Sequence, residues 1–146
     1  MRLALLVFLV GTPFQAQAYD GRIGDAVVEL RSGNVGSSLE LSQMLLPKWR
    51  GGLLLSQAWS GQQMPFGLGM LLAYEGHRRG YALLPRARLA TAIALVQDGG
   101  LGLNVQLDAG LLWYVIRSAG VGLSLGAQLW GSNLTPDASL SLVARW

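Results

Sequence analysis

Large apolar residues alternate with small or polar residues over long stretches of the chain. Residues 66–74 read Phe-Gly-Leu-Gly-Met-Leu-Leu-Ala-Tyr, with most of the large side chains on one parity and mostly glycine or alanine on the other. The alternation recurs over residues 101–107, 121–129 and 140–146. A β-strand turns successive side chains to opposite faces. The pattern therefore predicts strands with one apolar face and one small or polar face.

The second face decides which side of the predicted sheet points inward. In a soluble barrel, the face that meets water normally carries many charges. From residue 66 onward this face holds mostly glycine, alanine, serine, asparagine and glutamine, with few charges and no lysine. Small residues suit the crowded interior of a closed barrel, whereas large apolar residues suit hydrocarbon. The sequence thus predicts a transmembrane barrel with its apolar face outward.

Turn-forming residues divide the chain into eight strands. Gly, Pro, Asn, Asp and Ser favour turns, and they gather in seven segments: 31–34, 47–52, 60–65, 76–80, 97–100, 117–120 and 131–137. Tilted membrane strands need about 9 to 11 residues, and eight is the smallest usual strand number. The predicted fold is all-β, a closed antiparallel eight-stranded barrel, with strands over residues 23–30, 35–46, 52–59, 66–75, 81–96, 101–116, 121–130 and 138–146.

The first eighteen residues have the composition of a secretory signal peptide. Arg2 gives a positive n-region, residues 3–10 form an apolar h-region, and Ala16-Gln17-Ala18 forms an A-x-A cleavage site. The apolar run of about eight residues is too short for a membrane helix, which needs roughly 20. We therefore expect a signal peptide at 1–18, export, and one barrel domain at 19–146.

The remaining composition excludes several classes of protein. Without Arg2 the chain has ten basic and eight acidic residues, and no cluster of basic and aromatic residues suggests nucleic-acid binding. The chain has no cysteine, so no disulfide contributes to its stability. No cofactor or metal site is expected, because the sequence has one histidine and its acids are dispersed.

Aromatic residues fall near the ends of the predicted strands. Such rings favour the headgroup level of a membrane, although any one of them could serve only in packing. The residues of this predicted belt are Trp49, Trp59, Phe66, Tyr74, Tyr81, Trp113 and Trp146.

Together these features resemble the small outer-membrane β-barrels of Gram-negative bacteria. In that family the last strand is an assembly signal, with a C-terminal Phe or Trp preceded by apolar residues at alternating positions. The matching residues are Leu140, Leu142, Ala144 and Trp146. The resemblance implies contact with outer-membrane lipid and insertion by the barrel-assembly machinery. It covers residues 19–146 as a pattern.

An even number of strands returns both chain ends to one side, which is the periplasm in this family. The predicted outer loops are short and carry Arg31, Asp98 and Asp137, while the periplasmic turns are basic. Polar residues often simply end strands. The alternative is a docking surface for an acidic periplasmic or secretion-system partner, formed by Lys48, Arg50, Arg78, Arg79 and Arg117.

Six charged residues fall on the inward parity: Glu29, Glu40, Glu75, Arg86, Arg88 and Asp108. Buried charges persist when they are paired. We expect Arg86 and Arg88 to bridge Glu75 and Asp108 on the neighbouring strands, giving a network that fixes the barrel. The alternative is a charged gate in a narrow pore.

Catalysis is the main competing function, because some small outer-membrane barrels modify lipid A. Such hydrolases need a nucleophile and a base within hydrogen-bond reach. The only histidine, His77, falls in a predicted periplasmic turn, whereas Ser132 beside Asn133 falls in an outer loop. Barrel-type lipid A deacylases carry His two residues before such a Ser-Asn pair, where this chain has Trp130. We therefore predict that the protein is not an enzyme.

The sequence thus predicts a non-enzymatic outer-membrane barrel with a structural, anchoring or assembly role. Docking of a periplasmic or secretion-system partner is one form of that role. A narrow channel for small solutes is the alternative function, because an interior rich in Gly, Ala and Ser leaves room in the bore.

Overall fold

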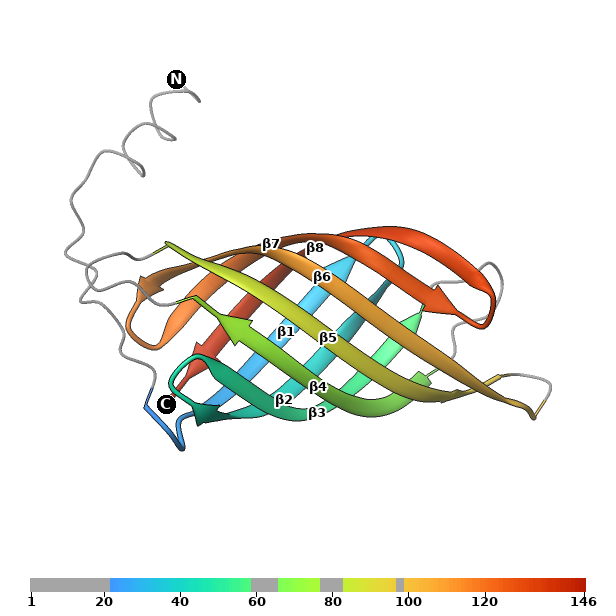
Figure 1. Cartoon of the computed structure of the whole chain (residues 1–146), viewed down its shortest axis with the longest axis horizontal. Helices are drawn as coiled ribbons and strands as arrows, with labels where there is room; N and C mark the ends of the chain where they lie inside the picture. Colours follow the sequence, from blue (N-terminus) through green and yellow to red (C-terminus); the bar gives the residue numbers. More distant parts are fainter. Residues whose placement is uncertain (1–21, 59–65, 77–82, 97–98) are drawn as a thin grey trace, which may run out of the picture.

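The computed structural model describes residues 22–58, 66–76, 83–96 and 99–146. Eight antiparallel strands follow one another around a closed barrel, in which the last strand pairs with the first (Figure 1). The strands are β1 (Ala26–Gly33), β2 (Gly36–Leu46), β3 (Trp49–Ala58), β4 (Phe66–Glu75), β5 (Leu83–Leu95), β6 (Leu101–Ile116), β7 (Ala119–Trp130) and β8 (Asn133–Arg145). This confirms the predicted all-β class and closed eight-stranded topology. The predicted signal peptide lies outside the described residues.

Four predicted turns lie partly within strands, among them residues 31–33 in β1 and residues 119–120 in β7. Residues 49–52 belong to β3, because the β2–β3 turn is confined to Pro47 and Lys48. Gly52 lies so close to the backbone of Ser42 that a Cβ there would collide with it, so this glycine is needed within the strand. Residues 133–137 pair with β7, because the β7–β8 turn is made at Gly131, which has a positive φ of 59°.

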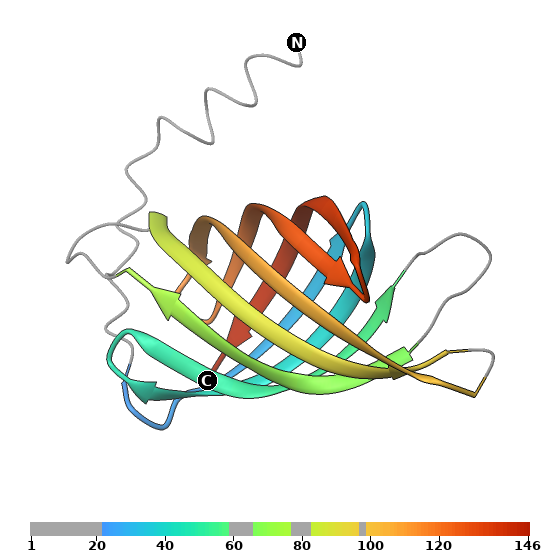
Figure 2. The same ribbon diagram turned by 45° about the vertical axis from the view of Figure 1, so that its right-hand side comes forward.

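The pairing register determines how far the strands tilt. Stepping from Val27 to its paired residue on each following strand leads around the barrel to Thr135 on β8. On its other side Val27 pairs directly with Arg145 of β8, which lies ten residues after Thr135. The path is Val27, Ser42, Gly52, Leu71, Ala90, Gln106, Gln128 and Thr135. This shear of ten over eight strands gives a tilt of about 40° and about 2.5 Å of height per residue. Figure 2 shows the resulting inclination of the strands.

Burial alternates along the strands as the sequence predicts. In β5, for example, Leu84, Arg86 and Arg88 are buried, whereas Leu83 and Leu89 are exposed. The barrel is therefore inverted relative to a soluble one, with large aliphatic side chains outside and most of the charges inside. No helix among the described residues is long and apolar enough to cross a membrane.

The chain enters β1 and leaves β8 at the same end of the barrel. Ala26 and Trp146 exchange two backbone hydrogen bonds, of 3.0 and 3.1 Å. We call this end the terminal rim. It also holds the β2–β3 and β6–β7 turns, while the β1–β2 and β7–β8 turns lie at the opposite rim.

Candidate functional site: the charged bore and the two rims

Among the described residues, ten charged side chains lie buried in the bore of the barrel. They comprise five carboxylates and five arginines, each with at most 8% of its surface exposed. Their formal charges cancel, and a buried charge needs such a partner to avoid a large desolvation cost. The ten residues are Glu29, Arg31, Glu40, Arg50, Glu75, Arg86, Arg88, Asp108, Asp137 and Arg145.

Five of these residues form a cluster toward the terminal rim. Glu29 accepts hydrogen bonds from Arg50 and from Arg86, the latter at 2.6 Å. Arg50 Nε also lies 2.8 Å from Glu75 Oε1. Arg145 Nη2 donates to Glu75 Oε2 at 2.7 Å. The cluster joins β1, β3, β4, β5 and β8 across the bore.

The other five residues continue the network toward the opposite rim. Arg88 contacts Glu40 at 2.5 Å and Asp108 at 3.0 Å. Arg31 contacts the same Asp108 at 2.9 Å and Asp137 at 3.2 Å. A longer contact of 4.0 Å between Arg50 and Glu40 links the two clusters. The described charges of the bore thus form one connected network.

β7 joins the network through a hydroxyl group. Arg86 donates from Nε and Nη2 to Ser124 Oγ, at 3.0 and 2.8 Å. All eight strands are therefore linked through the interior as well as through the sheet. Arginine suits this role because its planar guanidinium offers several donors in a fixed arrangement.

The structure brings together only part of the predicted network. Arg88 meets Asp108, but Arg86 reaches Glu29 on the far side of the bore. Glu75 is the cross-strand partner of Arg86 in the register, yet its carboxylate contacts Arg50 and Arg145. The prediction considered only neighbouring strands, and in a narrow barrel a long arginine also reaches strands farther around.

Three assignments to turns or loops were wrong. Arg50 was predicted to dock a periplasmic partner, but its side chain is fully buried in the bore. Arg31 and Asp137 were placed in outer loops, but they lie in β1 and β8 and contact each other. The prediction ended β1 too early and began β3 and β8 too late. Correct bounds would have placed all three residues on the inward parity, whereas Arg145 already lay on that parity within the predicted strand 138–146 and was not counted.

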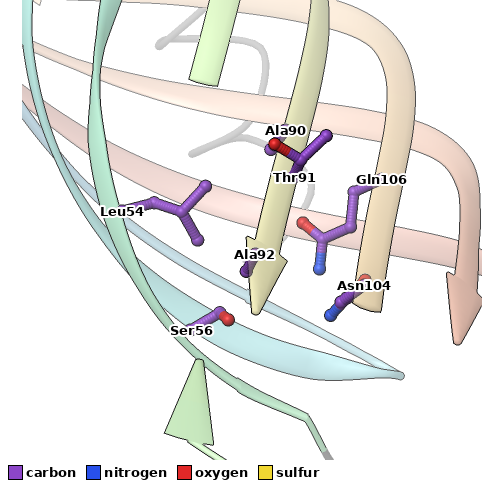
Figure 3. A pocket seen from close by; sticks show the side chains of 7 residues that line it. All are labelled: Leu54, Ser56, Ala90, Thr91, Ala92, Asn104 and Gln106. Carbon is purple, nitrogen blue, oxygen red and sulfur yellow. The ribbon is translucent and has the colours of Figure 1, made fainter. Parts of the chain in front are cut away.

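An uncharged part of the bore lies beside the network (Figure 3). Leu54 and Ser56 of β3 face small or amide side chains of β5 and β6. The space is about 130 Å³, and none of it is wide enough for a water molecule. Gly67 lies here, and a Cβ on it would come within 2.9 Å of Ser56 Oγ and 3.2 Å of Ala94 Cβ. Small residues therefore let the adjacent strands β3, β4 and β5 pack closely here, where the sequence had suggested a cavity.

The terminal rim carries exposed basic side chains. Lys48 lies in the β2–β3 turn and Arg117 in the β6–β7 turn, on opposite sides of the rim. Arg22, before β1, is also exposed. Arg78, Arg79 and Asp98 lie outside the described residues.

Aromatic side chains gather at the same rim. Trp49 and Tyr74 are paired between β3 and β4, and their ring centroids lie 5.2 Å apart in a T-shaped contact. Trp113 lies near the end of β6, and Trp146 follows β8. Phe66 begins β4 at the opposite rim. Trp59 and Tyr81 fall outside the described residues.

The residues of the predicted assembly signal form the outward face of the closing strand. Leu142 pairs with Leu30 and Ala144 with Val28 at the seam between β8 and β1. Leu140 and Trp146 are strongly exposed, at 66% and 70%. These side chains would meet lipid in a membrane.

Of the two residues weighed for catalysis, one lies within the described part of the chain. Ser132 is exposed in the β7–β8 turn at the opposite rim, and Trp130 ends β7. His77 lies outside the described residues. Within the described part of the chain, no group of three His, Asp or Glu side chains is arranged to hold a metal ion.

A closed antiparallel barrel with an apolar exterior and a charged, packed bore defines a class of protein. It has the fold of the small eight-stranded outer-membrane β-barrels of Gram-negative bacteria, whose strands cross the membrane. This agrees with the resemblance found in the sequence.

Solved structures bear out this assignment of the fold. The N-terminal β-barrel domain of Pseudomonas aeruginosa OprF matches with a TM-score of 0.69 at 15% identity, covering 85% of this chain and 98% of that one. Neisserial surface protein A matches with a TM-score of 0.56 at 14% identity, covering 84% and 94%. A de novo designed transmembrane β-barrel gives 0.57 at 13% identity, covering 87% and 99%. No family model and no curated protein sequence matches the chain.

Proposed function

We propose that this protein is a non-enzymatic outer-membrane barrel with a structural or anchoring role and a sealed bore. The observation that carries the proposal is the network of ten buried charges, which crosses the bore and leaves no net formal charge. A pore that selects ions by charge uses side chains that face water. Here the arginines and carboxylates are instead paired with one another.

The uncharged part of the bore supports the same proposal over a narrow channel. The space around Leu54, Ala92 and Asn104 is too narrow for a water molecule. A solute would have to displace both the ion pairs and these packed side chains, and breaking one buried pair costs about 3 to 5 kcal/mol.

Conductance of the refolded barrel in planar bilayers tests the proposal. We expect no discrete conductance steps from the wild type once heat-modifiable migration on gels has verified that it is folded. The double variant Glu40→Ala/Arg88→Ala removes two long side chains from the bore and should raise conductance, while Lys48→Ala at the rim should not. Regular conductance steps from the folded wild type would favour the channel instead.

We further propose that β8 serves as the signal for the barrel-assembly machinery. Its outward residues Leu140, Leu142, Ala144 and Trp146 lie at the seam that closes the barrel. Trp146→Asp should abolish insertion while leaving export intact, because it puts a charge at the membrane interface. Cell fractionation measures both steps. Normal outer-membrane levels of the variant would refute the assignment.

Docking at the terminal rim is a second candidate function. It is favoured by the placement of Arg22, Lys48 and Arg117, because the described residues of the opposite rim include no exposed charge. Because Arg50 is buried in the bore, it is not part of the proposed surface. The surface comprises Lys48, Arg78, Arg79 and Arg117, and it would fit an acidic periplasmic partner. Arg78→Glu/Arg79→Glu should then fail to complement a deletion strain that Asp98→Asn complements. Full complementation by the charge reversal would remove this proposal.

A further inference from the structure

The apolar band on the outward face differs greatly in height around the barrel. On β6 it runs without a polar residue from Leu101 to Val115, and on β7 from Ala119 to Leu129. At about 2.5 Å per residue these spans are about 35 and 25 Å high. The hydrocarbon-facing band of outer-membrane barrels is about 25 Å high. This flank therefore spans such a membrane fully.

The flank formed by β1, β2 and β3 is much shorter. Its outward apolar residues run from Ala26 to Leu30 on β1, from Leu39 to Leu45 on β2 with Gln43 between them, and from Trp49 to Leu55 on β3. These spans are about 10 to 15 Å high. In Figure 1, where the long axis lies horizontally and the opposite rim is on the right, β1 and β2 reach less far to the right than β5 and β6.

Three polar residues end the apolar band on this flank. Ser32 pairs with Ser37, and Ser37 pairs with Gln57, so the three lie in one row across β1, β2 and β3. We call this row the polar notch. The register places Ser32 within about 3 Å of the height of Leu107 on β6 and Leu125 on β7. At this height the β1–β3 flank is polar, whereas the flank formed by β6 and β7 is apolar and faces hydrocarbon.

Tilting the whole barrel cannot remove this difference. A tilt raises one flank and lowers the other, but it does not lengthen the apolar band on either. A bilayer adapts to a short apolar stretch by becoming thinner beside it. A protein partner fits the notch poorly, because binding surfaces centre on aromatic or large anchoring residues, and the notch consists of two serines and a glutamine.

We propose that the β1–β3 flank thins the outer leaflet beside it by about 10 to 15 Å, the shortfall of its apolar band against a membrane of about 25 Å. Lipid headgroups descend to the polar notch, while lipid beside β5–β8 keeps its normal height. The inference rests on the proposed placement of the barrel in the outer membrane. It assigns the barrel a local effect on lipid beyond its role as an anchor.

Site-directed spin labelling tests this directly, because the wild-type chain contains no cysteine. Nitroxides at Ser32→Cys and Ser37→Cys report on the notch, and Leu107→Cys is the control at matched height. In dioleoylphosphatidylcholine vesicles we expect a polar nickel chelate to reach positions 32 and 37 several-fold more readily than position 107. At position 107, apolar molecular oxygen should reach the spin label more readily than the nickel chelate does.

The outcomes separate the two proposals. Equal shielding of all three labels from the chelate overturns the thinning and leaves the membrane placement intact. Equal access at all three means that the barrel does not lie in hydrocarbon, which overturns the placement as well. Shielding of position 32 that appears only at high protein density assigns the flank to a second copy and also overturns the thinning.

A complementary experiment extends the short band. The triple variant Ser32→Leu/Ser37→Leu/Gln57→Leu removes the polar notch, and Thr91→Leu on β5 is the control for added hydrophobicity. Urea midpoints are compared between dierucoyl- and dimyristoleoyl-phosphatidylcholine vesicles. The triple variant should shift its preference toward the longer lipid relative to wild type, and Thr91→Leu should not. Identical lipid preferences of the triple variant and the wild type overturn the proposal.

Discussion

The bore contains two regions that are filled in different ways. Around Arg50 and Arg88, long side chains from opposite strands meet in the middle of the barrel. Around Gly67, Ala92 and Ala94, side chains are too short to meet in this way, and the neighbouring strands β3, β4 and β5 instead pack closely against one another. Both solutions exclude an open passage, but they depend on different forces: charge pairing in the first and close backbone approach in the second.

The largest expected effect is from a break in the charged region. Arg50→Ala leaves Glu29 and Glu75 without one of their arginine partners, in a position with no access to solvent. We expect a loss of about 3 to 5 kcal/mol in the free energy of unfolding. Urea midpoints in lipid vesicles measure it, and Lys48→Ala, two residues away in the exposed turn, is the control. Equal midpoints for the two variants would mean that the network contributes little to stability.

Each region contains a buried serine, so the same substitution of serine by alanine can be compared between them. Ser124 accepts two hydrogen bonds from Arg86, whereas Ser56 donates one long bond of 3.4 Å to the carbonyl oxygen of Gly67. Ser124→Ala should cost about 1.5 to 3 kcal/mol, because its partner is charged, and Ser56→Ala at most about 1 kcal/mol. The same urea titration decides this. A larger loss from Ser56→Ala would reverse our view of where polar pairing matters.

The uncharged region should instead be sensitive to added volume. A Cβ at Gly69 would collide with the backbone of Thr91 on β5, whereas Gly100 has nothing within 4 Å of that position. Gly69→Ala should therefore cost about 1 to 3 kcal/mol, and Gly100→Ala should have little effect. A Gly69→Ala barrel as stable as wild type would show that the wall can move outward there, and that close approach is not required.

Much of the fold could be predicted because it depends on local patterns. β4 and β6 have the predicted bounds, since turn-forming residues flank each of these two segments. β1, β3 and β8 were placed less well. Their ends contain Gly51-Gly52, or Asn, Pro and Asp near residue 136, which favour turns when considered alone. The surrounding pairing keeps them extended.

The candidate site could be predicted only in part. Parity placed Glu29, Glu40 and Asp108 inside without any structure, because a period of two fixes the face of every residue in a strand. Arg50 and Arg31 were missed, because a shift of two or three residues in a strand end changes an interior position into an apparent turn.

The sequence by itself determined that this chain forms a barrel with its apolar face outward, because that conclusion needs only the alternation of residues and the scarcity of charge on the second face. Tertiary structure alone decided which charges meet. Closure with a shear of ten sets Glu29 of β1 against Arg86 of β5, and Arg145 of β8 against Glu75 of β4. It also determines the relative heights of the apolar bands on the two flanks, because a strand's height in the membrane depends on its register with every neighbour around the barrel.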